Sequence, residues 1–137
     1  MDDKGPLRLL LEIADFGRFL TSETEKIQPT RVTGNVPVLV LCSLELDGAQ
    51  RPTDLAAMTQ LTTGRMTQVV DELEHDRLVQ RTADPSDGRA VRVEITDAGR
   101  ELLMELEATI ISALRTHPAR VAAFRDALSG LGLVEDT

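Results

Sequence analysis

Apolar residues recur at helical spacing through the first part of the chain. Between about residues 6 and 27 they follow one another every three or four positions, and further leucines on either side widen the stripe. Pro6 suits the first turn of a helix, where its missing N–H leaves no bond unmade. We therefore expect a long helix over 6–27 with a broad apolar face. The residues that define this face are Leu9, Ile13, Phe16 and Leu20.

A loop and a second, almost wholly apolar segment come next. Residues 28–35 include Pro29, Thr30 and Gly34, a composition typical of a loop. Residues 36–46 then predict a short buried helix that ends near Gly48. A buried strand over 36–42 is the alternative, because period does not separate helix from strand in a short apolar run. The length of the segment and its leucines favour the helix.

Two further helices are expected toward the C-terminal end. Thr96 has the side chain of an N-cap, and apolar residues recur at helical spacing from Leu102 to Leu114. Pro118 can open another helix that stops near Gly130. A chain of 137 residues has little core left for these helices and the first one to cover. We therefore expect a homodimer that buries their apolar faces by two-fold symmetry. The alternative is that both ends wrap their own domain.

The middle of the chain predicts a helix-turn-helix. Thr53 can cap a short helix over 54–59. Gln60 and Leu61 then form a turn, and Thr62 can cap a second helix that runs to about residue 75 or 77. This second helix has a coherent inner face, because its apolar residues follow at spacings of about three, one and three. The inner residues are Met66, Val69, Val70 and Leu73.

The outer face of the second helix carries side chains suited to reading DNA. Arg65 can offer two donors to guanine, Gln68 can pair with adenine, and the methyl groups of Thr63 and Thr67 can contact thymine. The acidic residues come later, from Asp71 onward. They would lie away from the duplex if the helix enters the major groove by its N-terminal end. A plain surface helix, capped by its threonines, is the alternative.

Two strand-like runs after this helix predict a β-hairpin, which would form a wing. They span 78–82 and 90–95. The second run alternates, so that Val91, Val93 and Ile95 would face inward. The connecting residues 84–89, DPSDGR, are turn formers.

Arginines give this hairpin a local positive charge. They are Arg81, Arg89 and Arg92, and we expect Arg89, beside the tip, to enter a minor groove. Asp87 is expected to hold a neighbouring arginine in place. The alternative is that Asp84 and Asp87 are ordinary turn acids that bond to their own backbone.

Composition narrows the possible functions. Hydrophobic residues make up 42% and charged residues 28% of the chain, values typical of a folded globular protein. Aromatic residues make up only 2%, which argues against readers that stack bases on aromatic side chains. The formal net charge is −8, so any affinity for DNA must come from a local basic surface.

The inventory of reactive side chains argues against an enzyme or a metal site. Cys42 is the single cysteine, and His75 and His117 fall in different predicted elements, so neither a disulfide nor a structural zinc site is expected. No nucleophile has a nearby base, and no glycine loop could cradle a phosphate. No cofactor is expected. The acidic N-terminus lacks an apolar leader and no run is long enough to span a membrane, so we expect a cytoplasmic protein.

Residues 55–102 resemble the multiple antibiotic resistance regulator (MarR) family. Their sequence is LAAMTQLTTGRMTQVVDELEHDRLVQRTADPSDGRAVRVEITDAGREL. The most specific part is Asp84, Pro85, Asp87, Arg89 and Ala90. The resemblance implies a mainly α fold with a small β-hairpin wing, in a single domain over 1–137. A winged helix-turn-helix lobe over about 36–96 would be flanked by dimerisation helices over about 6–27 and 97–130. Such a homodimer would bind a pseudo-palindromic promoter site, usually as a repressor.

The chain departs from the family's pattern at several places, among them Thr63 and Gly64, which are milder than the usual pair on the recognition helix. Thr59 and Gln60 stand where the turn usually has an apolar residue and a glycine, and Arg77 replaces a glycine common before the first wing strand. Gln68 replaces a basic residue of the recognition helix. These losses predict that recognition depends heavily on Arg65, Arg89 and phosphate contacts.

The expected DNA contacts follow from the helix, the wing and the resemblance together. They are Thr53, Thr62, Thr63, Gly64, Arg65, Thr67, Gln68, Arg81, Ser86, Asp87 and Arg89. The family is often released from DNA by a small phenolic or lipophilic effector bound between lobe and dimerisation helices. The residues expected to line such a pocket are Phe16, Leu20, Val38 and Cys42. A redox role for Cys42 is disfavoured, because a buried thiol has a raised pKa. The rival function is a winged interaction or ligand-sensing module that does not bind DNA specifically.

Overall fold

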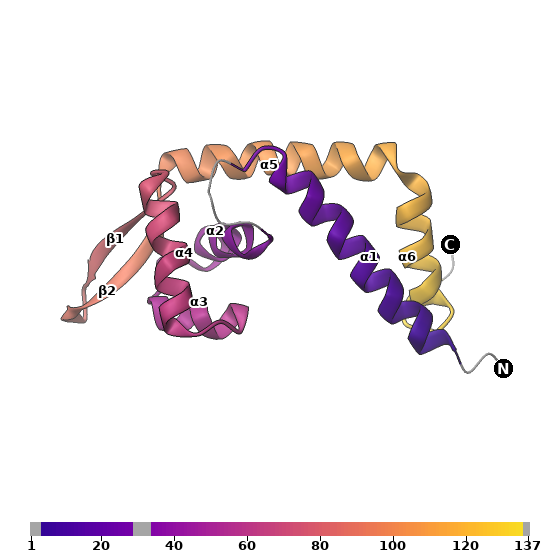
Figure 1. The fold of residues 1–137 in the computed structure, drawn as a ribbon, viewed down its shortest axis with the longest axis horizontal. Helices are drawn as coiled ribbons and strands as arrows, with labels where there is room; N and C mark the ends of the chain where they lie inside the picture. The colour runs from indigo at the N-terminus through magenta and orange to yellow at the C-terminus, as the bar shows by residue number, and fades with distance from the viewer. Residues whose placement is uncertain (1–3, 29–33, 136–137) are drawn as a thin grey trace.

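The computed structural model describes residues 4–28 and 34–135 of the chain. Within them it has helices and one antiparallel β-hairpin, arranged as in Figure 1. The elements are α1 (Gly5–Glu25), α2 (Val36–Asp47), α3 (Pro52–Thr59), α4 (Thr63–His75), β1 (Val79–Asp84), β2 (Asp87–Ile95), α5 (Asp97–Thr116) and α6 (Pro118–Ser129). The predicted mainly α winged helix-turn-helix architecture is confirmed.

The long helix α5 joins two parts of the molecule. At its N-terminal end it meets a lobe made of α2, α3, α4 and the hairpin, and at its C-terminal end the chain turns into α6, which lies beside α1 (Figure 1). The junction with the lobe is close, because a Cβ atom on Gly99 would collide with the carbonyl oxygen of Leu78. Only glycine allows α5 to start so near the base of the hairpin.

An aliphatic core fills the lobe. Helix α2 supplies Val40, Leu41 and Leu44, which lie among residues of all the other lobe elements and of α5. Because α2 is covered on several sides, its sequence is apolar all round, as the pattern of residues 36–46 indicates. The helix predicted there is confirmed, and the alternative strand over 36–42 is wrong. The side chains from α3, α4, the hairpin and α5 that close the core include Leu55, Met66, Val70, Leu73, Val79, Val93 and Leu103.

The three phenylalanines hold α1 and α6 together. Phe16 stacks on Phe124, with ring centroids 5.0 Å apart. Arg120 lies over the ring of Phe19 at 4.6 Å from its centroid, and its Nη1 is 3.2 Å from Oδ2 of Asp15. These contacts join helices that are about a hundred residues apart in the sequence.

The two terminal helices leave much of their apolar surface uncovered in one copy of the chain. Leu7, Leu10, Leu11 and Ile13 of α1 are each at least half exposed. No residue of α6 is buried. Leu133, just after α6, is 61% exposed. A second surface is therefore needed to cover these faces.

Some predicted boundaries are wrong. Helix α3 starts at Pro52, whose ring fits the first helical position, so Arg51 is the N-cap and Thr53 lies inside the first turn instead of capping the helix. The strands extend farther toward the tip than 78–82 and 90–95. Val91 is 42% exposed and not inward-facing, because the outer part of the hairpin projects beyond the lobe. Most of the loop predicted over 28–35, including Pro29, Thr30 and Thr33, lies outside the described residues.

None of the helices in the described ranges has the length and apolar character that crossing a membrane requires.

Candidate nucleic-acid interface

Helix α4 begins with a capped and exposed turn. The hydroxyl of Thr62 accepts a hydrogen bond from the backbone N–H of Arg65 at 3.1 Å, as predicted for an N-cap. The hydroxyl of Thr67 donates to the carbonyl of Thr63 at 2.9 Å. The inner face is buried as expected, and the exposed residues of the first turns are Thr62, Thr63, Gly64, Arg65, Thr67 and Gln68.

The two helix ends that border α4 adopt left-handed backbone conformations. Gln60 has φ 59° at the end of α3, and Arg77 has φ 62° just after α4. These are two of the positions where the sequence departs from the family's glycines. The positive φ at these two positions accounts for the glycines that the MarR-family pattern has there, because glycine adopts a positive φ without the steric penalty of a side chain.

Asp84 fixes the tip of the wing. Its Oδ1 accepts from the backbone N–H of Ser86 at 2.9 Å and from the Ser86 hydroxyl at 2.7 Å. Its Oδ2 lies 2.9 Å from Nη2 of Arg51, at the start of α3. The bonds from Ser86 and then from Arg51 outweigh burial and lower the pKa of Asp84 to about 2. Asp84 therefore stays charged and joins the tip to α3.

Asp87 does not hold an arginine side chain as predicted. Its Oδ1 accepts from the backbone N–H of Arg89 at 3.1 Å. The turn-acid alternative is therefore correct for Asp87, whereas Asp84 combines turn bonds with an arginine. The partner of Asp84, Arg51, was not among the predicted site residues, because nothing in the local pattern links positions 33 apart.

Arg81 is not a free positive charge on the wing. Its Nη1 lies 2.6 Å from Oε1 of Glu74 and its Nη2 lies 2.7 Å from Oδ1 of Asp71, both on α4. Its backbone N–H also donates to Glu74 at 3.1 Å. Burial lowers the pKa of Arg81, but the bonds and charges of the two carboxylates outweigh it and raise the pKa. Arg81 therefore joins β1 to α4.

The base of the wing has a third attachment. Gln50 forms a backbone bridge with Val93, with N···O distances of 3.0 and 2.7 Å. Arg92 donates from Nη2 to the carbonyl of Ala49 at 2.8 Å. The hairpin is thus attached to the segment before α3 as well as to α3 and α4, so it forms one unit with the helix-turn-helix.

The wing tip and the N-terminal end of α4 lie at the same end of the lobe, away from α5 (Figure 1). Strand β1 runs back along α4, since Arg81 meets Asp71 and Glu74 before Asp84 reaches α3. Arg65 and Arg89 are exposed, and among residues 4–28 and 34–135 neither takes part in an ion pair. Thr53, Ser86 and Asp87 are exposed too. The elements at this end of the lobe therefore carry two exposed arginines, Arg65 near the start of α4 and Arg89 near the wing tip, and several residues with hydroxyl groups.

Of the four residues predicted to line an effector pocket, the structure brings two together on one cavity. A cavity of about 420 Å³ lies between α2 and α5, and Val38 and Cys42 line it. Phe16 packs on α6 instead, and Leu20 is not among the lining residues, because α1 meets the cavity one turn later, at Thr24. Burial, followed by the charge of Glu107, raises the pKa of the Cys42 thiol, as expected for a weakly reactive cysteine.

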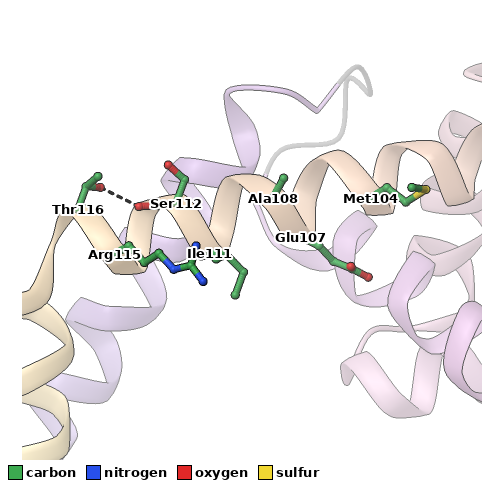
Figure 2. A pocket seen from close by; sticks show the side chains of 7 residues that line it. All are labelled: Met104, Glu107, Ala108, Ile111, Ser112, Arg115 and Thr116. Atoms are coloured by element: carbon green, nitrogen blue, oxygen red, sulfur yellow. Dashed lines mark hydrogen bonds between the residues drawn. The ribbon is translucent and has the colours of Figure 1, made fainter.

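A wide groove of about 710 Å³ follows the exposed face of α5 (Figure 2). Met104 and Ile111 supply apolar surface along it, and Thr116 closes its far end with a hydrogen bond to the carbonyl of Ser112. Met104 is 68% exposed. The described part of the chain holds no cluster of three or more side chains suited to a metal ion.

Comparisons with known proteins agree with this geometry. Residues 37–91 match the sequence model of the MarR family. The repressor NicR of Pseudomonas putida is 32% identical over 69 residues, which cover 50% of this chain and 44% of that protein. The matches span less than half the length of the curated relatives.

Two solved structures share the fold over nearly the whole chain. The transcriptional regulator BldR of Sulfolobus solfataricus has a TM-score of 0.69 at 24% identity, covering 96% of this chain and 95% of its own. Bordetella bronchiseptica BpsR, whose DNA binding is regulated by 6-hydroxynicotinic acid, has a TM-score of 0.62 at 22% identity, covering 91% and 92%. The matched residues contain α3, α4 and the first part of the wing, so this part of the chain is similar to the MarR family of winged helix-turn-helix proteins.

Proposed function

We propose that this protein is a sequence-specific DNA-binding transcriptional regulator, a repressor that acts as a homodimer on a pseudo-palindromic site. The observation that carries the proposal is that the N-terminal end of α4, which contains Arg65, and the wing tip, which Arg89 follows, lie at the same end of the lobe (Figure 1). Both arginines are exposed and outside any ion pair of the described residues. With net charge −8 the protein as a whole repels DNA, so these local cations have to supply the attraction.

The parts of the lobe have separate tasks in this proposal. The first turns of α4 enter the major groove, where Arg65 pairs with guanine and Gln68 with adenine. Arg89 enters the adjacent minor groove from the wing tip. The hydroxyl groups and small residues around them approach the phosphates and fix the register. This group comprises Thr53, Thr62, Thr63, Gly64, Thr67 and Ser86.

Dimer formation would cover the apolar faces that one copy leaves open. Three features support a second copy as the missing partner. They are the exposed leucines of α1, the helix α6, in which no residue is buried, and the groove along α5. Two-fold symmetry would then set the two α4 helices about 34 to 36 Å apart, one turn of duplex, in the DNA-bound state. Sedimentation velocity tests this part, and a species with the mass of a single chain would contradict it.

Release by a small effector is part of the proposal. The cavity between α2 and α5 supports it, because α2 belongs to the lobe whereas α5 runs on toward the terminal helices. A ligand there would touch both parts and could change their relative position.

Fluorescence anisotropy with a promoter fragment from upstream of the protein's own gene tests the function. We expect the fragment to bind more tightly than a scrambled duplex of equal length. Arg65→Ala and Arg89→Ala should each weaken binding by about 10- to 100-fold. Equal and salt-insensitive affinity for both duplexes would instead favour a winged module that binds a protein or a ligand.

A further inference from the structure

The cavity between α2 and α5 has an apolar wall. Val38 of α2 and Leu103 and Leu106 of α5 contribute to it, and the two leucines are also part of the lobe core. Its volume of about 420 Å³ is within the range that holds a small organic molecule. The wall can therefore take an apolar group of the size of a substituted ring or a short alkyl chain.

Among the described residues, the charged groups of this cavity are all acidic. Glu45 of α2 and Glu107 of α5 line it, and none of the described lysines, arginines or histidines does so. Glu45 is already bonded to Arg100, with its Oε2 2.9 Å from Nε of the arginine. The hydroxyl of Thr24, the other oxygen group in the lining, donates to the carbonyl of Thr21 at 2.8 Å. Glu107 is thus left as the charged group with no ion pair among the described residues.

Glu107 is exposed and lines both this cavity and the groove along α5. Its side chain projects from α5 toward the lobe (Figure 2). Burial and then the charge of Glu107 raise the pKa of the Cys42 thiol, which lines the same cavity from α2. An anion bound here would meet this carboxylate without a cation to offset it, whereas a cation would gain from it.

We propose that the cavity between α2 and α5 binds lipophilic cations, namely aryl or alkyl amines whose ammonium group pairs with Glu107 while the apolar part contacts Leu103 and Leu106. The effect of such a ligand on transcription rests on the proposed function, but its binding does not. The chemistry differs from that of 6-hydroxynicotinic acid, the carboxylic acid that regulates BpsR. A cavity lined by carboxylates selects against that class.

Three compounds with one skeleton and different charges test the proposal. The probes are 4-phenylbutylamine, 4-phenylbutan-1-ol and 4-phenylbutyrate, titrated calorimetrically into the full chain at low salt without DNA. The amine should bind more tightly than the alcohol, and the alcohol more tightly than the acid. Glu107→Gln should weaken the amine by about three- to fivefold and leave the alcohol unchanged, because the pair is partly exposed to solvent.

Glu105→Gln is the matched control. Glu105 lies on α5, two positions from Glu107, is exposed and does not line the cavity. Its replacement removes the same charge from the same helix, and we expect the affinity for the amine to stay unchanged. If both variants weaken the amine equally, the effect is general electrostatics and the proposal is wrong. Tighter binding of the acid than of the amine, or no binding of any of the three compounds, overturns it as well.

DNA binding is measured separately, so the two proposals can fail independently. If the charge order of the ligands holds but the promoter fragment does not bind, the regulator function is wrong and the cation site stands. If the fragment binds but the acid binds more tightly than the amine, the cation site is wrong and the regulator function stands.

Discussion

Arg51 and Asp84 lie 33 positions apart in the sequence, yet their side chains form an ion pair with an Nη2···Oδ2 distance of 2.9 Å. This pair joins the start of α3 to the tip of the wing. Arg81 makes the corresponding link from β1 to Asp71 and Glu74 of α4. Carboxylate–guanidinium pairs that do not involve Arg65 or Arg89 therefore join the wing to α3 and α4.

The role of Arg81 can be separated from that of Arg89 by salt dependence. Arg81→Ala should weaken operator binding by roughly three- to tenfold through misplacement of the wing. The slope of log affinity against log salt should stay unchanged, because no phosphate contact is lost. A cation that does neutralise a phosphate contributes about 0.9 to that slope, so we expect Arg89→Ala to reduce it. Anisotropy titrations at several salt concentrations measure both slopes, and an equal reduction for Arg81→Ala would make Arg81 a DNA contact after all.

The low pKa of Asp84 predicts when its ion pair is lost. In the folded protein this pKa is about 2, below the ordinary value of 3.8, so the charged carboxylate stabilises the fold above pH 3.8. That contribution decreases as the pH falls from about 4 to about 2. The difference in stability between the natural protein and Asp84→Asn should be constant from pH 5 to 8 and shrink in acid. Thermal unfolding by circular dichroism measures it, and a difference that changes between pH 6 and 8 would point to another group.

The two left-handed residues predict stabilising substitutions. Gln60→Gly and Arg77→Gly should each raise the free energy of unfolding by about 0.5 to 1 kcal/mol, because glycine removes a steric penalty that exceeds its own entropic cost. Alanine at the same positions keeps the Cβ atom and should give no gain. Urea denaturation compares the four variants. Equal effects of glycine and alanine would show that the backbone conformation is not the cause.

At the start of α5, in contrast, replacing a glycine should lower the stability of the protein. Gly99→Ala places a methyl group against the carbonyl of Leu78 and the side chain of Ile95, so it should destabilise the protein by about 1 to 3 kcal/mol. Gly17→Ala is the control, because nothing lies within 4 Å of its added Cβ atom in the middle of α1. It should stabilise the protein by up to about 1 kcal/mol. If Gly99→Ala is as stable as the natural protein, α5 and the hairpin are not in close contact.

The sequence predicts the elements of this fold better than the contacts between them. The helices and the wing follow from local spacing, and Thr62 and Thr96 cap α4 and α5 as their side chains indicate. Thr53 does not cap α3, because Pro52 competes for the first position of the helix. A local pattern could show that Arg81 is a cation beside the recognition helix, but not that two carboxylates of that helix already bind it.

The pocket shows the same limit. Phe16 and Leu20 lie on the predicted apolar stripe of α1, but which element covers each part of that stripe depends on how α1 crosses α6 and α5. Phe16 meets Phe124, and only Thr24, farther along α1, reaches the cavity. The acidic lining could not be predicted either, because Glu45 and Glu107 come from different helices and only the packing of α2 on α5 brings them to one cavity.

The most direct test of the central claim is a hydroxyl-radical footprint of the purified protein on the DNA upstream of its own gene. Two copies of α4 and two wings bound to one site predict two protected half-sites, related by two-fold symmetry, with centres about 10 base pairs apart. Weaker protection should flank each half-site where Arg89 enters the minor groove, and Arg89→Ala should remove it. Uniform cleavage along the fragment, or protection of a single half-site, would contradict the account.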